Sequence, residues 1–190
     1  GKKGKALPVV SVGAAKNKSF FQRFSEYIRA NFFVPDARVG WVKYAIKQAE
    51  EILKTEKIDA IITTGPPHST HLIGLDLKER FGVKWVADFR DPWTGIFYND
   101  ILPRTEATRK KDSELENRVL RTADHVSVIS PGMKKEFENR AKQIDVVFNG
   151  YDEEEFASAV NTRNGVFTVR YVGNLMASQN AEVLWQAINL

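Results

Sequence analysis

Residues 58–93 decide the fold, and they read IDAIITTGPPHSTHLIGLDLKERFGVKWVADFRDPW. The β-branched run over 58–64 stops at Gly65-Pro66-Pro67 and predicts a short buried strand. The apolar spacing over 68–80 predicts a helix, and the run over 83–89 predicts a second strand. A strand, a helix and a strand in this order form a βαβ unit, whose two strands lie parallel.

The same alternation continues on both sides of this stretch. Helices are expected over 39–57, 105–122 and 131–140, and strands over 125–130 and 144–148. Strands that are separated by helices of about ten or more residues are typical of βαβ units. The predicted fold class is therefore α/β, a Rossmann-like parallel sheet with helices on both faces.

Three parts follow one another along the chain. Residues 1–33 form a basic, aromatic N-terminal arm and helix, 34–157 form the main Rossmann-like domain, and 158–190 begin a second domain. The second domain would open with a strand over 166–172 and a helix capped by Asn180. Because the chain stops inside that apolar helix, we expect a piece of a longer protein. An exposed strand would pair with a sheet edge, either its own or that of a second copy in a dimer.

The N-terminal arm combines aromatic and basic side chains. Phe20, Phe24, Tyr27 and Ile28 share one face of a predicted helix. Such a stripe packs against the body of a protein more often than not, and this is the preferred interpretation. The alternative is peripheral contact with an anionic membrane.

Composition excludes several classes of protein. The chain has 190 residues, no cysteine and a net charge of +4, with 43% hydrophobic and 27% charged residues. The lack of cysteine excludes disulfide scaffolds, thiolate metal sites and cysteine nucleophiles. The mild positive charge permits nucleotides or lipid headgroups as partners, and no nucleic-acid partner is expected. No apolar run reaches the roughly 20 residues of a membrane-spanning helix, and a cytoplasmic location is expected.

The loop after the 83–89 strand carries the most reactive side chains. Asp88 and Asp91 flank Arg90, and Trp93 follows. A carboxylate at a strand end can accept sugar hydroxyls or act as a base, and a guanidinium can hold phosphate oxygens. The alternative is structural: Asp88 and Arg90 would pair with the loop backbone, and Trp93 would fill the core.

Two other loops carry candidate residues. His68 is a candidate general acid or base, and either it or Ser69 could cap the helix that follows. His71 is expected to be structural, and no third ligand is spaced to complete a metal site. Ser130 begins a helix whose free N–H groups could bind an anion, although capping alone explains it equally well.

Several stretches together resemble a known family. They are VPDARVGWVKYAIKQAEEILK, IDAIITTGPPHSTHLIG, VKWVADFRDPW, ADHVSVISPGMKKEF and VVFNGYDEEEF, followed by RYVGNL. In this order they resemble bacterial glycosyltransferases of family four, which have the two-domain GT-B fold. The resemblance covers the chain from about Val34 onward.

The resemblance implies a retaining hexosyltransferase that needs no cofactor or metal. It would move a sugar from a nucleotide-sugar donor to a carbohydrate or lipid-linked acceptor in cell-surface polysaccharide synthesis. His68, Asp88 and Asp91 would be catalytic on the acceptor side, with Ser69, Arg90, Trp93 and Ser130 binding substrate. Gly173, Asn174 and Gln179 would bind the donor.

Two departures from the family keep alternatives open. Nothing before Val34 matches the glycine-rich opening of many relatives, and Asn174 and Gln179 replace the cations that clamp the donor diphosphate. The chain alone is therefore expected to be inactive. A non-catalytic carbohydrate-binding or scaffold module on the same fold is the main alternative, and a sugar-nucleotide epimerase of similar shape is a third.

Overall fold

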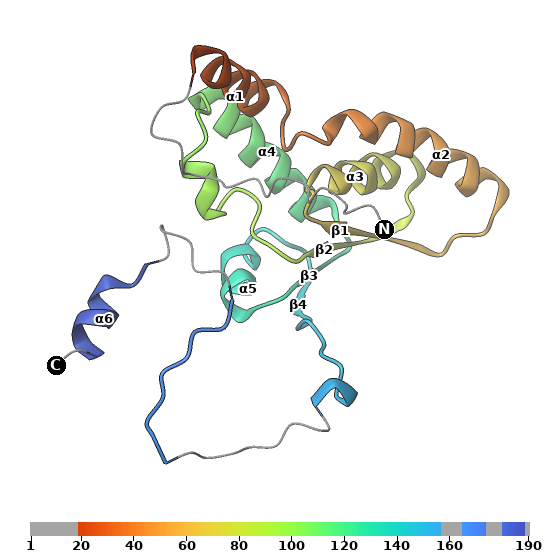
Figure 1. The fold of residues 1–190 in the computed structure, drawn as a ribbon. Helices are drawn as coiled ribbons and strands as arrows, with labels where there is room; N and C mark the ends of the chain where they lie inside the picture. The colour runs from red at the N-terminus through yellow and green to blue at the C-terminus, as the bar shows by residue number, and fades with distance from the viewer. Residues whose placement is uncertain (1–18, 157–164, 174–179, 189–190) are drawn as a thin grey trace, which may run out of the picture. The chain divides into compact units, whose positions relative to one another are not determined.

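The computed structural model describes residues 19–156, 165–173 and 180–188. It divides into two units, Gly1–Gly150 and Tyr151–Leu190, each of which is described by itself. The first unit contains the sheet (Figure 1). In the second, the described residues contain a short 3₁₀ turn, η3 (Glu154–Phe156), and one helix, α6 (Glu182–Ile188).

Four parallel strands form the sheet in the order β1-β2-β3-β4. Their bounds are Ala60–Gly65 for β1, Lys84–Phe89 for β2, His125–Val128 for β3 and Ile144–Val146 for β4. The expected strands over 58–64, 83–89, 125–130 and 144–148 are all present, with ends that differ by at most two residues. The predicted α/β Rossmann-like parallel sheet is confirmed.

The helices of the first unit also lie where the apolar spacing placed them. They are α1 (Phe20–Phe32), α2 (Val42–Thr55, preceded by the 3₁₀ turn η1, Val39–Trp41), α3 (Ser69–Phe81), α4 (Glu106–Thr122) and α5 (Pro131–Phe137), with a 3₁₀ turn η2 (Phe97–Asp100) before α4. Gly82 ends α3 with a φ of 66°, a left-handed conformation that favours glycine.

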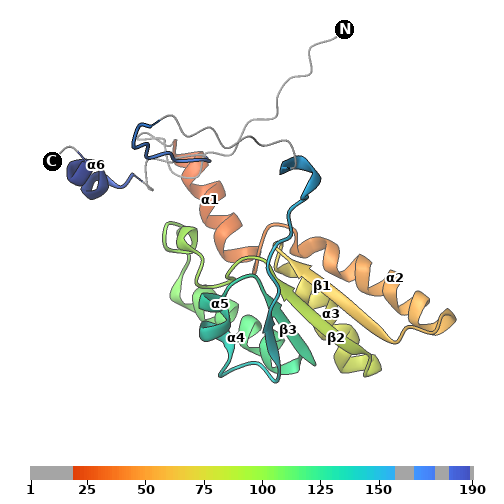
Figure 2. The same ribbon diagram turned by 90° about the horizontal axis from the view of Figure 1, so that it is seen from below.

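The helices that cover the sheet share one core. Trp85, Ala87 and Phe89 point from β2 into this core, where Val119 of α4 and Phe137 of α5 are fully buried. Figures 1 and 2 show α3 and α4 on the same side of the strands. Sequential strand order with right-handed crossovers places every connecting helix on one face.

The opposite face of the sheet is not covered by these helices. Ile62 on β1 is 72% exposed, and Thr64 beside it is also exposed. Helices were expected on both faces. Among the described residues, α3, α4 and α5 pack on one, because β1 to β4 follow one another in a single direction across the sheet.

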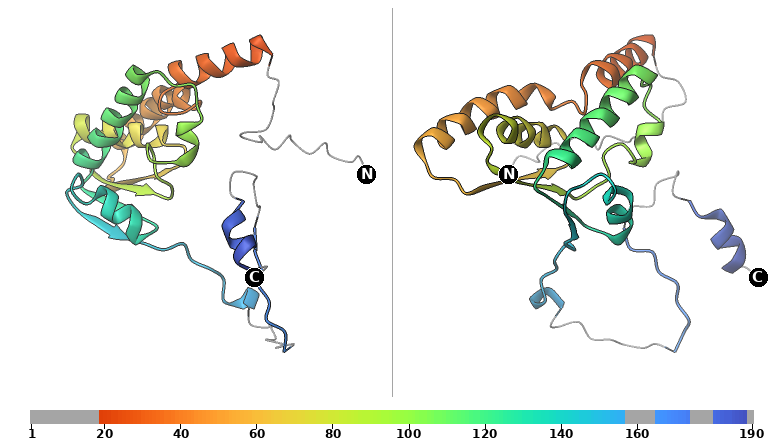
Figure 3. Two further views of the ribbon diagram at one scale, coloured as in Figure 1. Left: turned by 90° about the vertical axis from the view of Figure 1, so that its left-hand side faces the viewer. Right: turned by 180° about the vertical axis from the view of Figure 1, so that it is seen from behind.

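The aromatic stripe of helix α1 was expected to pack against the body of the protein, and among the described residues it does not. Phe20, Phe21 and Phe32 are 77%, 80% and 72% exposed, so the aromatic stripe is not packed on the body of the unit. The helix is attached near its C-terminal end, where Ala30 is buried and Asn31 bonds to the loop before α4. Figure 3 (left) shows its first turns extending away from the sheet.

The strand expected over 166–172 is wrong for this structure. Residues 167–172 have no regular structure, and Phe167 and Val172 are 92% and 87% exposed. A strand needs a neighbour for its backbone groups, and the described residues of the second unit contain no strand. Asn180, expected to cap the next helix, instead accepts a hydrogen bond from the Trp185 indole at 2.8 Å.

Among the residues that the structure describes, no helix is long and apolar enough to cross a membrane.

Candidate functional site

Two loops start side by side at the carboxyl ends of β1 and β2. Gly65 and Phe89 are register partners at these strand ends. The backbone N–H of Arg90 donates to the Gly65 carbonyl at 3.0 Å, which extends the pairing by one residue. The His68 loop and the Asp88–Trp93 loop therefore leave the sheet at the same edge, where open parallel sheets bind ligands.

The two loops are joined by a ring contact between His68 and Trp93. Their ring centroids lie 5.2 Å apart, with an angle of 6° between the planes. His68 is 6% exposed and Trp93 is 2% exposed, so the contact is buried. It brings together two predicted site residues that are 25 positions apart in the sequence.

The ring nitrogens of His68 have no hydrogen-bond partner among the described residues. Burial lowers the pKa of His68. This effect is opposed only in part by the charge of Asp36, the Pro92 carbonyl, and the charges of Glu116 and Asp91. The imidazole is consequently neutral at neutral pH.

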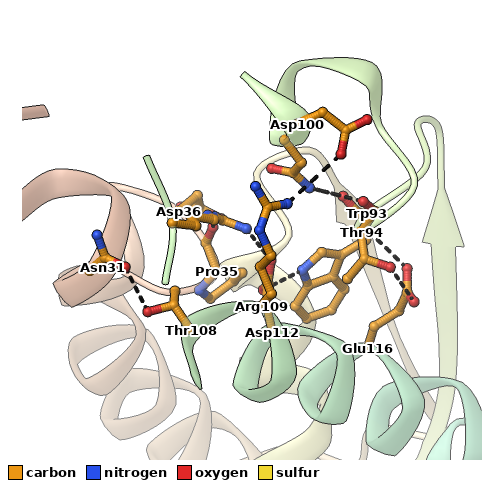
Figure 4. A network of polar contacts seen from close by, with 12 residues as sticks. Asn31, Pro35, Asp36, Trp93, Thr94, Asp100, Thr108, Arg109, Asp112 and Glu116 are labelled. Carbon is orange, nitrogen blue, oxygen red and sulfur yellow. Dashed lines mark hydrogen bonds and ion pairs between the residues drawn. The ribbon is translucent and has the colours of Figure 1, made fainter. Parts of the chain in front are cut away.

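The Trp93 indole binds a buried carboxylate of α4. Its indole N–H donates to Asp112 Oδ1 at 2.8 Å (Figure 4). Arg104 forms an ion pair with the same carboxylate and donates to the Pro35 carbonyl at 2.8 Å. Burial raises the pKa of Asp112, while the Trp93 N–H and the Arg104 charge act in the opposite direction.

A second carboxylate, one helical turn further along α4, holds the next residue of the loop. Glu116 accepts the backbone N–H of Thr94 at 3.0 Å and its hydroxyl at 2.9 Å (Figure 4). Arg140 donates to Glu116 at 2.8 Å and balances its charge. Asn99 donates to the Trp93 carbonyl at 2.9 Å. The loop that carries Arg90 and Asp91 is therefore anchored at its far end by α4.

Asp88 lies on the sheet face that the helices leave uncovered. It is the register partner of Thr64 on β1 and of Ser127 on β3. Both hydroxyls donate to it, Thr64 at 2.6 Å to Oδ2 and Ser127 at 2.7 Å to Oδ1. Asp88 therefore ties three strand ends together, and each of its oxygens already accepts one hydrogen bond.

Arg90 and Asp91 are the charged residues of this edge whose side chains are available. Arg90 is exposed and Asp91 is half-buried. Within the described part of the chain, neither side chain forms a hydrogen bond or an ion pair, apart from the electrostatic effect of Asp91 on His68. Because both residues lie at the carboxyl end of a parallel sheet, they are placed where such sheets bind polar ligands.

Ser69 and Ser130 are both occupied by helix capping. The Ser69 N–H and hydroxyl donate to Asp36 at 2.8 and 3.0 Å, so Asp36 caps the start of α3 and His68 makes no capping bond. Ser130 accepts the N–H of Met133 at 3.3 Å and caps α5, as expected. In this arrangement both serines position backbone.

His71 is structural, as the sequence predicted. It is fully buried, and its Nδ1 lies 2.9 Å from the Thr63 hydroxyl, which accepts the Trp85 indole N–H at 2.9 Å. Burial and the neighbouring His68 lower the pKa of His71 to about 3. The ring is therefore neutral throughout the physiological range.

The predicted donor-binding residues belong to the second unit. Gly173 is exposed, whereas Asn174 and Gln179 lie outside the described residues. Within the described ranges, no group of three or more His, Cys, Asp or Glu side chains could hold a metal ion.

The sequence reasoning missed the residues that build the support of the site: Asp36, Arg104, Asp112 and Glu116. A signal was present for the two on α4. Asp112 and Glu116 precede the buried Leu120 by eight and four residues, so all three lie on the inward face of the helix. A carboxylate at such a position needs a partner.

Comparison with known proteins gives one family. The model of Glycosyltransferase Family 4 matches residues 9–155. This match starts before Val34, the residue from which the sequence motifs were seen to resemble the family. No curated protein and no solved structure matches the chain. The match spans more than half of the chain and includes both loops of the candidate site. The chain belongs to Glycosyltransferase Family 4.

Proposed function

We propose that the chain is part of an enzyme that transfers a sugar from a nucleotide-sugar donor to a carbohydrate or lipid-linked acceptor, with retention at the anomeric carbon. The observation that carries this is the meeting of the two loops at the ends of β1 and β2, where His68 stacks on Trp93. The family match supports the glycosyltransferase class. Cell-surface polysaccharide synthesis in the cytoplasm is the process that we infer.

In this proposal the acceptor binds beside Arg90 and Asp91. The exposed guanidinium of Arg90 would bind phosphate or hydroxyl oxygens of the acceptor. The Asp91 carboxylate would accept a hydrogen bond from the attacking hydroxyl. It would take the proton as the acceptor oxygen bonds to the anomeric carbon and the nucleoside diphosphate leaves. His68 and Trp93 are buried, so they would support this loop and leave direct contact to its charged residues.

The donor would bind through the segment that contains Gly173, Asn174 and Gln179. Neutral amides can donate hydrogen bonds to phosphate oxygens, although they bind a diphosphate more weakly than cations do. No cofactor is required in this scheme, because the nucleotide sugar is itself a substrate.

The test uses the intact protein and a panel of nucleotide sugars. Isothermal titration would measure donor binding, and nucleotide release in the presence of acceptors would measure turnover. We expect Asp91→Asn to reduce turnover about a hundredfold or more. Arg90→Gln is expected to raise the KM for the acceptor about tenfold, as a lost charged hydrogen bond does.

Two matched variants control for loss of charge alone. Asp59 precedes β1 and Arg121 lies at the end of α4, at the opposite edge of the sheet, and both are exposed. Asp59→Asn and Arg121→Gln should leave turnover unchanged. Full activity of the Asp91→Asn variant would refute the assigned role, and absence of binding to every nucleotide sugar would refute the proposed reaction.

A non-catalytic carbohydrate-binding module remains the second candidate. It is favoured by the engagement of Asp88 with Thr64 and Ser127 and by the burial of His68, which together leave few free catalytic groups. Saccharide binding that depends on Arg90 and Asp91, with no nucleotide release from any donor, would select this function.

A further inference from the structure

Helix α1 presents an aromatic surface that the described residues of its unit leave exposed. At 3.6 residues per turn, one sector of the helix contains Phe20, Phe21, Phe24, Tyr27, Ile28 and Phe32, together with the anchoring Asn31 in the last turn. Phe20, Phe21, Phe24 and Phe32 are 56–80% exposed. We call these four side chains the α1 aromatic face. Exposed apolar patches of this kind mark interaction sites.

The side chains of the aromatic face support one another. Phe20 and Phe24 stack with ring centroids 6.5 Å apart, and Phe20 meets Phe21 edge to face at 6.1 Å. Ser19 and Gln22 form a capping box that fixes the start of the helix. The face is thus displayed on a formed helix.

The helix is attached to the body at its other end. Asn31 donates to the Pro103 carbonyl at 2.9 Å and accepts from the Thr105 N–H at 2.8 Å. It also accepts from the Thr108 hydroxyl at 2.8 Å (Figure 4). The first turns of α1 extend away from the sheet and from the other helices of the first unit (Figure 3). A flat surface could therefore approach the aromatic face without first meeting the other described residues of this unit.

Basic residues border the aromatic face. On the helical wheel Arg23 lies on one side of the aromatic sector and Arg29 on the other. Lys16 and Lys18 precede the helix in the sequence, and Glu26 is the one acidic residue between 16 and 33. Arginine and lysine beside an apolar face extend their charges to the headgroup level while aromatic rings enter the acyl boundary.

We propose that α1 docks the protein on a bilayer that carries anionic headgroups, lying in the interface with its aromatic face toward the acyl chains. The positive border complements a negative surface, which distinguishes a membrane from a second copy of this positively charged chain. This proposal is independent of the reaction proposed above.

The test is flotation of the intact protein with vesicles of phosphatidylcholine alone or with a third of phosphatidylglycerol. We expect binding to the anionic vesicles and little to the neutral ones. The double variant Phe20→Ser/Phe24→Ser should bind the anionic vesicles at least about tenfold more weakly, since two rings no longer enter the bilayer. Arg23→Gln/Arg29→Gln should also weaken anionic binding, by about tenfold.

Phe148→Ser/Phe167→Ser is the matched control, because both rings are exposed and lie outside α1. It should bind like the unchanged protein. Circular dichroism would confirm that each variant is folded, which is expected because the substituted rings are on the surface. Failure of the unchanged protein to float, binding that ignores lipid charge, or self-association that depends on Phe20 and Phe24 without vesicle binding would each overturn the proposal.

Discussion

The imidazole of His68 lies parallel to the indole of Trp93, with ring centroids 5.2 Å apart. His68 comes from the loop after β1, and Trp93 comes from the loop after β2. Their contact closes the space between the two loops, and Asp112 of α4 holds the indole from its N–H side at 2.8 Å. A chain of contacts therefore runs from the sheet edge to α4. His68 stacks on Trp93, Trp93 donates to Asp112, and Asp112 pairs with Arg104.

The hydrogen bond between Trp93 and Asp112 can be removed with little change in shape. Trp93→Phe keeps a ring against His68 but removes the indole N–H. The buried Asp112 Oδ1 then loses the hydrogen bond that this N–H donates. We expect a loss of about 1–3 kcal/mol in the free energy of unfolding, measured by urea denaturation. A smaller ring also leaves a cavity, which acts in the same direction.

Trp185→Phe provides the comparison for this prediction. The Trp185 indole donates to Asn180 at 2.8 Å, but that pair is exposed to solvent. Its loss should cost less than about 0.5 kcal/mol. Equal effects of the two substitutions would show that burial of Asp112 is energetically unimportant.

His71 should make the stability of the protein depend on pH. Its pKa is lowered to about 3 in the folded protein, against 6.5 for an unperturbed histidine. Between these values the unfolded chain binds the proton and the folded protein does not, so stability is complete above pH 6.5 and falls as the pH decreases. The slope for one histidine is about 1.4 kcal/mol per pH unit.

Urea unfolding at pH 7.5 and pH 5 would measure this effect. In the His71→Gln variant the decline between the two pH values should be smaller than in the unchanged protein by about 2 kcal/mol. His125→Gln, a change at a partly exposed histidine on β3, should retain the decline because His71 is still present. An unchanged decline in His71→Gln would contradict the assignment.

Gly74 on α3 should not tolerate a side chain. A Cβ there would lie 2.3 Å from the Trp85 ring, which is itself fully buried. Gly74→Ala should therefore destabilise the protein by about 1–3 kcal/mol, although alanine favours a helix more than glycine does. Thermal unfolding followed by circular dichroism would measure this loss.

Gly40, in the turn before α2, has open space where its Cβ would be. Gly40→Ala should leave the melting temperature unchanged or raise it. A melting temperature for Gly74→Ala that matches that of Gly40→Ala would show that α3 can move away from β2.

Much of the fold followed from local patterns. Short apolar runs predicted all four strands, and apolar spacing predicted the helices between them. The sheet edge where the His68 loop and the Asp88–Trp93 loop meet was also predicted, because parallel strands carry their carboxyl ends to one edge.

Other expectations depended on burial. The Phe-rich helix was expected to pack, and residues 166–172 were expected to form a strand, yet neither found a partner surface among the described residues. An apolar pattern indicates which side chains favour burial. It does not show whether a surface is present to bury them.

The sequence by itself determined the alternation of strands and helices, the parallel sheet and the edge at which the charged loops emerge, since these depend on periodicity over a few residues. Only the tertiary structure decided that Asp88 bridges three strands and that Asp112 and Glu116 hold the Trp93 loop. Those contacts join residues 19–39 positions apart. They depend on strand register and on which helical face is buried, and no local pattern specifies either.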